Sequence, residues 1–143
     1  MHKYLNDVYY EKMNNPYRGG TADVWYSGLH GDMWVEYKYL PSVPKRGTIV
    51  PALSDLQRKW LYERELEGRQ VAVIVGCPSG GVWFKGKDIF DGIPVEEFNP
   101  VARSVLAEDI RQLVGTSPCR TSPGFTLQSG SLPQSTASLR PLY

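Results

Sequence analysis

The sequence is poor in cysteine and histidine, which excludes several kinds of active site. It contains two of each, Cys77 and Cys119, and His2 and His30. Structural zinc sites need Cys and His side chains at close spacing, so zinc binding is disfavoured. No Gly-x-Ser-x-Gly motif occurs, and catalysis by a serine triad has little support. Two distant cysteines favour a reduced, cytoplasmic protein, with a Cys77–Cys119 disulfide as the alternative.

Long apolar runs, a phosphate-binding loop and a strong charge bias are missing as well. No apolar stretch approaches the roughly 20 residues that span a bilayer, and we expect no signal peptide at the amino terminus. A Gly-rich loop followed by Lys-Ser/Thr is absent, which disfavours nucleotide hydrolysis of that type. The formal net charge is +1. Overall charge therefore does not predict nucleic-acid binding.

Composition divides the chain into a domain and a tail. Residues 1–115 suit a single domain with a hydrophobic core. From Thr116 onward Ser, Thr, Pro, Gly and Gln dominate, and the charged residues are Arg120 and Arg140. Such a segment buries too little apolar surface to fold. We expect residues 116–143 to be a disordered tail, with a partner-binding segment as the alternative.

Two short runs rich in aromatic and β-branched residues predict a β-hairpin. The runs are Asp23–Tyr26 and Met33–Lys38, and they are separated by the glycine-containing loop 27–32. Side chains alternate between the two faces of a strand, so Glu36 and Lys38 share a face. If Tyr26 pairs with Met33, the register places Asp23 directly opposite Glu36.

The alternation alone leaves two interpretations of this hairpin open. In the first, Glu36 and Lys38 lie with Trp34 on a solvent face, as in many half-buried antiparallel strands. The core face would then consist of Met33, Val35, Tyr37 and Tyr39. In the second, Asp23 and Glu36 form a cation site. Like charges directly opposite destabilise a ladder, and hard divalent cations take oxygen ligands.

Downstream of the hairpin the pattern predicts further helices and strands. These elements are a proline-rich loop over 40–51, helix 54–67, strands 71–75 and 82–85, and helix 101–114. Ser54 and Gln57 form a capping box, and Gly68 suits the end of that helix. The expected buried contacts are Leu56, Trp60 and Leu61 in the first helix and Val105, Ile110 and Leu113 in the second. The unbroken apolar run 71–75 is typical of a strand covered on both faces and parallel to strand 33–38.

Before the hairpin, residues Tyr4–Asn14 have a spacing of apolar residues that predicts a helix. Asp7 and Glu11, four residues apart, would lie on one face of it, and Pro16 would end it. The glycine pair Gly19-Gly20 then permits a sharp turn into the hairpin. The predicted fold is therefore α/β, with the order α-β-β-α-β-β-α and a mixed sheet flanked by helices.

The acidic pair and the lysine also resemble a known signature. Asp23 followed by Glu36-x-Lys38 resembles the PD-(D/E)xK nuclease motif, with Ala22 in place of the proline. Segments 15–26 and 32–38, together with Leu53-Ser54-x-x-Gln57-x-x-Trp60, resemble small phage endonucleases related to VRR-NUC domains and phage junction-resolving endonucleases. The resemblance covers about residues 4–86 and implies a restriction-endonuclease-like fold.

The resemblance implies a role for each matching residue. Asp23 and Glu36 would bind Mg²⁺ or Mn²⁺ with the carbonyl of Tyr37, and Lys38 would position the attacking water. The implied catalytic set is Asp23, Glu36, Lys38, Glu11 and Gln57. Members of the family often carry another acid on the first helix, and Glu11 is preferred over Asp7 for that position. The capping box explains Gln57 as well as a place near the active site does. The family leaves 5′-phosphate and 3′-hydroxyl ends.

Cations after the hairpin are candidates for contact with DNA. Lys45, Arg46, Arg58 and Lys59 form a mildly basic stretch. They would contact phosphates or simply lie on a solvated surface.

The expected function is a metal-dependent endonuclease that nicks or resolves branched DNA during phage replication or recombination, in the host cytoplasm and as a homodimer. The alternatives are a non-catalytic DNA-binding or assembly protein with the same fold, and a sequence-specific restriction enzyme.

Overall fold

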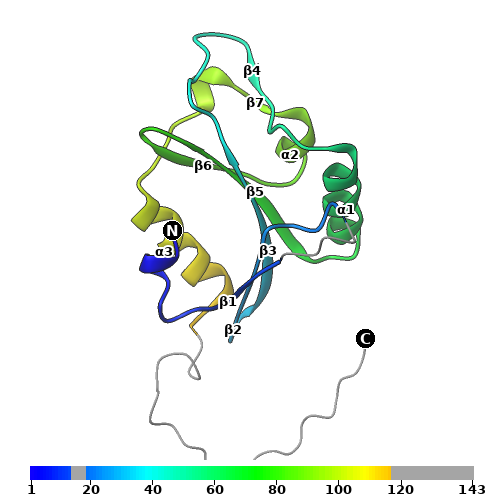
Figure 1. Ribbon diagram of the computed structural model, residues 1–143, viewed down its shortest axis with the longest axis vertical. Helices are drawn as coiled ribbons and strands as arrows, with labels where there is room; N and C mark the ends of the chain where they lie inside the picture. Colours follow the sequence, from blue (N-terminus) through cyan, green and yellow to red (C-terminus); the bar gives the residue numbers. More distant parts are fainter. Residues whose placement is uncertain (14–18, 117–143) are drawn as a thin grey trace, which may run out of the picture.

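The fold is built on a five-stranded mixed sheet with helices on both faces (Figure 1). The computed structural model describes residues 1–13 and 19–116. In spatial order the strands are β1 (Tyr9–Lys12), β2 (Val24–Gly28), β3 (Gly31–Tyr39), β5 (Gln70–Cys77) and β6 (Gly80–Phe84). The covering helices are α1 (Asp55–Leu66) and α3 (Arg103–Val114). The predicted α/β class and mixed sheet are confirmed.

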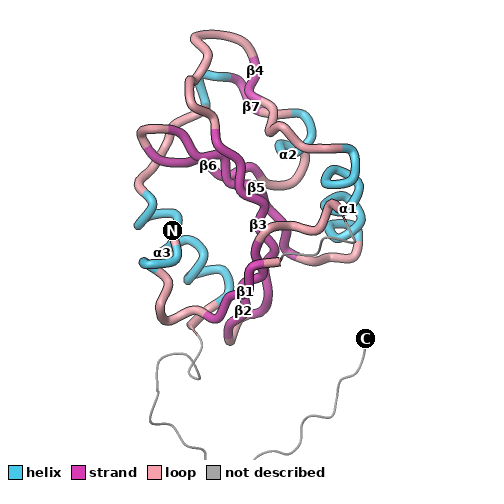
Figure 2. The backbone as a smooth tube through the Cα atoms, viewed as in Figure 1, coloured by secondary structure: helices cyan, strands magenta, loops and turns pink. Residues whose placement is uncertain are grey.

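Smaller elements complete the domain (Figure 2). They are the 3₁₀ turns η1 (His2–Tyr4) and η2 (Val95–Glu97), strands β4 (Thr48–Ile49) and β7 (Ile93–Pro94), and helix α2 (Asp88–Asp91). β4 and β7 pair as a separate two-stranded sheet. The loop expected over residues 40–51 therefore contains a short strand. Its apolar anchor is Ile49, which is 5% exposed.

The predicted hairpin forms in the predicted register. β2 and β3 are antiparallel, and Tyr26 pairs with Met33. The turn is tighter than the expected loop 27–32, since only Leu29 and His30 lie between the strands. The His30 N–H donates to the carbonyl of Val114 at 2.7 Å, which ties the turn to the end of α3.

Both faces of β3 and β5 are covered. Ala72 and Ile74 belong to the core beneath α3, whereas Val71, Val73 and Val75 belong to the core beneath α1. β5 is parallel to β3, as the helix between them predicts. The interpretation that one face of the hairpin is wet is wrong, because α1 covers that face as well. Of the expected core face, Met33, Val35 and Tyr37 pack inward, but Tyr39 is 62% exposed.

The capping box at the start of α1 is present. Ser54 Oγ accepts the Gln57 N–H at 3.1 Å, and Gln57 Oε1 accepts the Ser54 N–H at 3.0 Å. The helix ends at Leu66, and Gly68 adopts φ +84, a left-handed conformation that favours glycine. The predicted limits of this helix are therefore confirmed within a residue or two.

The predicted helix over Tyr4–Asn14 is wrong. Residues 2–4 form a single 3₁₀ turn, and Tyr9–Lys12 form strand β1, which pairs with β2. Leu5 and Val8 are fully buried, so the apolar spacing was real but belongs to a turn. An exposed sheet edge offered by β2 outweighs local helix preference. The predicted helix stop at residues 14–16 falls within segment 14–18, outside the described residues.

Two predicted core contacts are also wrong. Leu56 is 59% exposed and Val105 is 46% exposed. The buried faces of α1 and α3 are rotated relative to the predicted ones. The buried residues of α3 are Leu106, Ala107, Ile110 and Val114. In α1 Leu61 is buried as expected, Trp60 packs against the core beneath α1, and Leu113 packs against the core beneath α3.

Two further expectations concern cysteine and membranes. Cys77 is a free thiol buried in β5, and Cys119 lies outside the described residues, as does the expected tail beyond residue 116. Among the helices of residues 1–13 and 19–116, none is long and apolar enough to span a bilayer.

Candidate active site

Asp23 and Glu36 face each other across the β2–β3 ladder. Val24 pairs with Val35, and one further step of the antiparallel register sets Asp23 against Glu36. Asp23 lies just before β2, where the ladder opens. Its Oδ2 accepts the backbone N–H of Tyr37 at 2.9 Å, so a side chain replaces the strand hydrogen bond. This contact fixes the first carboxylate against the second strand.

Glu36 is a buried charged residue with one oxygen left unpaired. It is 2% exposed. Its Oε2 accepts a hydrogen bond from Gln57 Nε2 at 2.8 Å and lies 3.5 Å from Lys38 Nζ. Its Oε1 is buried without a hydrogen-bond partner among the described residues. Burial of an unpaired carboxylate oxygen is costly, and such atoms mark sites where a ligand completes the coordination.

The electrostatics of Glu36 follow from the same geometry. Burial, and then the negative charge of Asp23, raise the pKa of Glu36 from its ordinary 4.5 to about 7, while Lys38 lowers it. Trp34 and Trp60 contribute to the burial, with ring centroids 5.2 Å apart above this face of the sheet. A second positive charge near the pair would restore the ionised form.

Gln57 serves two purposes with its two amide atoms. Its oxygen closes the capping box on the Ser54 N–H, and its nitrogen donates to Glu36. The capping-box explanation of Gln57 is therefore confirmed, and the same side chain also contacts Glu36, while its catalytic role stays a prediction. The helix start fixes the side chain, which in turn orients the carboxylate.

Lys38 lies beside the two acids and keeps access to solvent. Its side chain is 26% exposed, against 3% for that of Glu36. It follows Glu36 by two residues, which places both on the face that α1 covers. A lysine in this position can contact both the carboxylate and a group arriving from solvent.

The oxygen donors suit a hard divalent cation. Among the described residues no group of three His, Cys, Asp or Glu could hold a metal, so a cation here needs Asp23, Glu36 and a further oxygen. The N–H and C=O of a residue in a strand point to the same side. Because the Tyr37 N–H points to Asp23, its carbonyl points to the same edge. Two carboxylates and a carbonyl match Mg²⁺ or Mn²⁺ and not zinc.

Glu11 is not on a helix but on β1. It pairs with Trp25, which pairs with Trp34, so its side chain is on the same face as Glu36 but two strands away. Its Oε2 accepts a hydrogen bond from the Tyr9 hydroxyl at 2.5 Å. The predicted position of Glu11 on a first helix is wrong, and its catalytic role stays a prediction.

The predicted DNA contacts lie in two places. Lys45 and Arg46 are exposed in the loop 40–47 between β3 and β4, which we call the arm. The base of the arm is held by the pairing of β4 with β7. Arg58 lies over the Phe90 ring at 5.5 Å, and Lys59 Nζ lies 3.9 Å from Glu63. Arg58 and Lys59 thus each have a neighbouring side-chain partner, although the Lys59 side chain is 72% exposed, whereas Lys45 and Arg46 are exposed in the arm.

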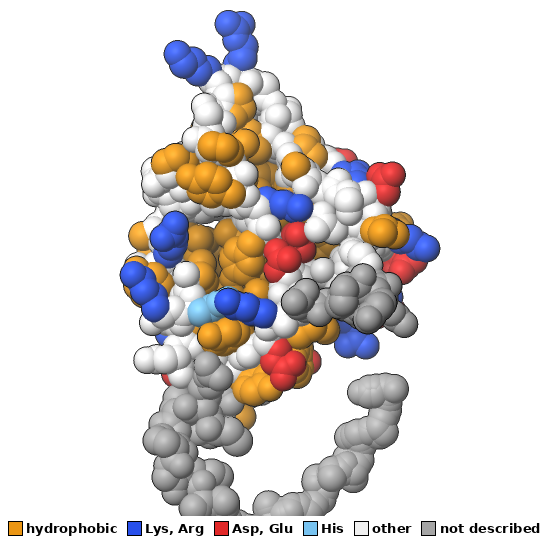
Figure 3. Space-filling view, viewed as in Figure 1, with side chains coloured by type: hydrophobic (Ala, Val, Ile, Leu, Met, Phe, Trp, Pro, Cys, Tyr) orange, Lys and Arg blue, Asp and Glu red, His pale blue; other side chains and the backbone are white. Residues whose placement is uncertain are grey.

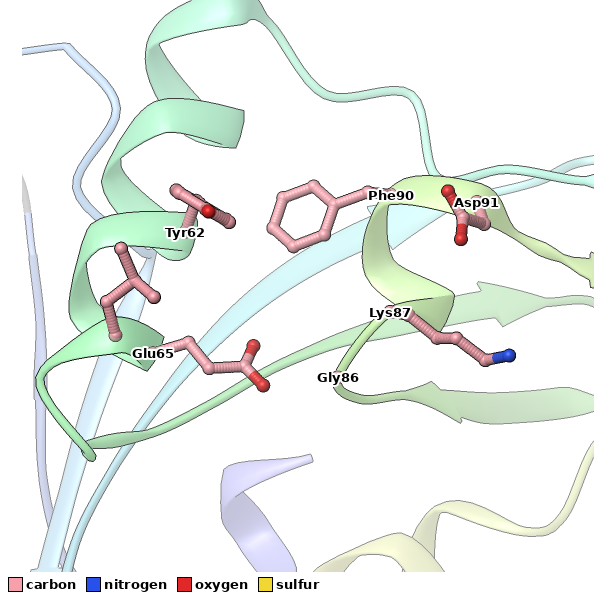
Figure 4. Close-up of a pocket in the computed structure, with 7 residues that line it drawn as sticks. Tyr62, Glu65, Gly86, Lys87, Phe90 and Asp91 are labelled. Atoms are coloured by element: carbon pink, nitrogen blue, oxygen red, sulfur yellow. The ribbon is translucent and has the colours of Figure 1, made fainter.

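A hollow between α1 and α2 lies apart from the two carboxylates (Figure 4). Its volume is about 310 Å³, and Tyr62 and Phe90 face each other across it with charged residues around them. These charged residues are Glu65, Lys87 and Asp91. The predicted site does not extend into this hollow.

The backbone contact that holds Asp23 could not be read from the sequence. The Tyr37 N–H is available because β2 begins only at Val24, and no residue type signals that. The sequence gives a weaker signal for the two tryptophans on this face. Trp34 lies two residues before Glu36, and Trp60 lies three residues after Gln57.

No family model and no curated protein matches the sequence. Among solved structures, the chain is similar to Hjc from Archaeoglobus fulgidus, a Holliday junction resolvase from an archaeal hyperthermophile. The two share 15% sequence identity with a TM-score of 0.41, and the match covers 56% of this chain and 66% of that one.

Proposed function

We propose that the chain is a metal-dependent DNA endonuclease with a restriction-endonuclease-like core. The observation that carries this proposal is Glu36, a carboxylate that is 2% exposed, opposed to Asp23 and left with an unpaired oxygen. A merely structural acid would have its oxygens satisfied by the protein. Gln57 and Lys38 converge on the other oxygen, as a preorganised metal ligand requires.

Each residue has a role in phosphodiester hydrolysis. A bound Mg²⁺ or Mn²⁺ supplies polarisation of the phosphoryl oxygen and hydroxide near neutral pH. Asp23, Glu36 and the Tyr37 carbonyl would hold it. Lys38 orients the attacking water and stabilises the negative charge that accumulates on the phosphate. Gln57 keeps Glu36 in one orientation throughout, and Glu11 is a candidate for an outer carboxylate.

The substrate proposed is branched DNA, nicked or resolved during phage replication or recombination inside an infected bacterium. This rests on the resemblance of segments 15–26, 32–38 and 53–60 to small phage endonucleases. Lys45 and Arg46 would contact backbone phosphates from the arm, with Arg58 and Lys59 contributing near α1. A homodimer would place two active sites on opposite strands, and sedimentation of the protein with and without a junction tests that arrangement.

The decisive experiment is cleavage of supercoiled plasmid and of a four-way junction, in Mg²⁺ and in chelator. Wild type should nick in Mg²⁺ only. Asp23→Asn, Glu36→Gln and Lys38→Met should each lower the rate on the order of 100-fold or more. Glu65→Gln, which changes an exposed acid of α1 away from the carboxylates, should cleave like wild type.

The outcomes separate the proposal from its rival. Equal traces of cleavage by wild type and Glu36→Gln would reveal contamination and end the enzyme proposal. Salt-sensitive binding of junctions without any cleavage would instead favour a non-catalytic DNA-binding protein.

A further inference from the structure

A row of three paired residues that begins just after Lys38 crosses three strands of the sheet. Tyr39 of β3 pairs with Gly76 of β5, and Gly76 pairs with Gly81 of β6. Paired residues project from the same face of a sheet, which here is the face of Tyr37 and α3. The row is thus a tyrosine followed by two glycines. Glycine weakens a strand interior and often marks close approach of a ligand or another backbone.

The row forms the floor of a hollow of about 360 Å³. Ile74 and Leu106 supply its apolar walls and Arg103 supplies positive charge, while Lys38 approaches it with its backbone, the Lys38 carbonyl oxygen lying 3.7 Å from a Cβ built on Gly76. Among the described residues that line it, none is acidic. Figure 3 shows hydrophobic side chains recessed on this side of the molecule, with Lys and Arg side chains around them and an acidic group beside them. Its chemistry is apolar inside and cationic at the rim.

The two glycines differ in how much room they leave. A Cβ on Gly81 would lie 2.9 Å from Leu106 Cδ1, so the hollow closes at that end. A Cβ on Gly76 would meet only Tyr39 Cδ1 at 3.6 Å and backbone oxygens at 3.7 Å. The space above Gly76 is therefore open, and a larger residue would fit there without a clash. The openness comes from the absence of a side chain.

Tyr39 stands at the open end. Its ring contacts the position above Gly76, yet the residue is 62% exposed. An exposed aromatic ring beside an open apolar floor is a stacking surface, and bases of any sequence stack on aromatic side chains. Arg103 lies at the rim, where the phosphate of such a nucleotide would lie.

We propose that this hollow binds one unpaired nucleotide of the DNA, with its base against Tyr39 over the Gly76–Gly81 floor and its phosphate at Arg103. Tyr39 follows Lys38 at the carboxyl end of β3 and projects from the opposite face of the strand, so this is a nucleotide near the proposed cleavage site and not the one that is cleaved, an assignment that rests on the proposed nuclease function. The enzyme then prefers gapped, flapped or junction DNA over intact duplex, because intact duplex must first unstack a base.

The hollow between α1 and α2 is the weaker candidate for the same ligand. It also has aromatic walls, Tyr62 and Phe90, but Glu65 and Asp91 line it (Figure 4). Carboxylates at the rim repel phosphates. Tyr62, which is 55% exposed, therefore provides a matched control for Tyr39.

The test measures binding in chelator, so that it does not depend on cleavage. Fluorescein-labelled duplexes of one sequence, intact or with a single-stranded gap, are titrated with the full chain. Wild type should bind the gapped DNA about tenfold more tightly, the effect of one stacked base. Tyr39→Ala, Arg103→Ala and Gly76→Val should each remove most of that preference and leave affinity for intact duplex nearly unchanged. Tyr62→Ala should retain the preference.

A second probe follows the base itself. 2-Aminopurine in the gap should lose fluorescence on binding wild type through stacking, and lose less on binding Tyr39→Ala. Circular dichroism checks the fold of Gly76→Val, and the exposed Tyr39→Ala keeps the test valid should that variant unfold.

Each outcome bears on one proposal. Equal affinity of wild type for both DNAs, or a preference that survives Tyr39→Ala and Arg103→Ala, overturns the nucleotide site while plasmid nicking stands. A clear gap preference in a protein that never nicks plasmid overturns the nuclease proposal and retains the binding site.

Discussion

Gln57 Nε2 donates a hydrogen bond of 2.8 Å to Glu36 Oε2, while Gln57 Oε1 caps the helix at the Ser54 N–H. The contact joins the start of α1 to the centre of the sheet. It also explains why the residue is glutamine, since glutamate serves equally well in a capping box but cannot donate to a carboxylate. Helix capping and orientation of the Glu36 carboxylate are thus performed by different atoms of one side chain.

The first prediction separates these two purposes. Gln57→Glu keeps the cap and should leave the free energy of unfolding nearly unchanged in chelator, apart from repulsion by Glu36. It should raise the Mg²⁺ concentration for half-maximal nicking by about tenfold to 100-fold, the usual effect of losing a partner of a metal ligand. Gln57→Ala should show the same metal defect plus a loss of about 1 kcal/mol from the cap.

Ser54→Ala is the matched control, because it removes one cap bond and touches neither carboxylate. It should lower stability by about 1 kcal/mol with little effect on the Mg²⁺ titration. An unchanged Mg²⁺ requirement in both Gln57 variants would contradict the positioning role of Gln57.

The second prediction concerns stability of the metal-free protein and pH. The pKa of Glu36 is raised from 4.5 to about 7 by burial and by Asp23. Between these values the folded state holds a proton that the unfolded state has released, so stability falls as pH rises from about 4.5 to about 7. Glu36→Gln lacks this loss. In chelator at about pH 8 it should be more stable than wild type by up to about 3 kcal/mol.

Urea unfolding at several pH values measures this difference. The two proteins should converge near pH 4, where Glu36 is protonated in both states. Added Mg²⁺ should stabilise wild type and not Glu36→Gln. A variant that is less stable than wild type at every pH would show that the carboxylate contributes to folding without metal.

Strand parity made the register of the hairpin predictable. One pairing, Tyr26 with Met33, fixes every other pair of the two strands, and the side that Glu36 occupies follows from it. The capping box was equally readable, because Ser54 and Gln57 act within one turn. The alternation of side chains along a strand does not reveal whether a given face is buried. α1 covers the Glu36 face, and that depends on a crossover of the chain.

The wrong predictions concern residues whose structure depends on contacts with distant parts of the chain. Tyr9–Lys12 suits a strand or a helix locally, and the free edge of β2 decides between them. Leu56 looked like a core residue, but at this end of α1 the helix packs on the backbone of Gly20, whose Cβ would lie 2.5 Å from the Leu56 carbonyl oxygen. The Tyr37 N–H that Asp23 accepts is free only because β2 begins one residue after Asp23, at Val24.

The third prediction tests the link between the amino-terminal segment and α3. Arg111 donates to both carboxylate oxygens of Asp7, at 2.8 and 2.9 Å, and to the Tyr4 carbonyl at 2.7 Å. This pairing lowers the pKa of Asp7 below its ordinary 3.8. Its stabilisation is therefore present above about pH 4 and is lost as pH falls through the lowered pKa.

Asp7→Asn should lower the free energy of unfolding by about 1 kcal/mol at pH 7, and the gap to wild type should close in acid. Glu108→Gln removes an exposed partner of the same arginine and should have a smaller effect. Nicking activity should survive both changes, which would distinguish Asp7 from Asp23 and Glu36, the proposed catalytic acids. A gap that stays constant down to pH 2 would show that charge does not explain it.

The fourth prediction concerns the arm that carries Lys45 and Arg46. These residues are exposed at the far end of a loop whose base is fixed by β4–β7 pairing and by the Val95 N–H, which donates to the Gly47 carbonyl at 2.9 Å. The arm follows the carboxyl end of β3, beyond Lys38. A base held by these contacts keeps the two cations at a set distance from the proposed active site, where each would contact one phosphate.

Lys45→Ala with Arg46→Ala should weaken binding to intact and gapped duplex alike. It should reduce the slope of log affinity against log salt by about 2, one phosphate for each cation. Arg69→Ala is the control, because Arg69 precedes β5 at the opposite end of the sheet and pairs with Glu67 at 2.9 Å. A salt slope unchanged by the double variant would remove the arm from the DNA interface. A loss confined to gapped DNA would instead place the arm at the unpaired nucleotide.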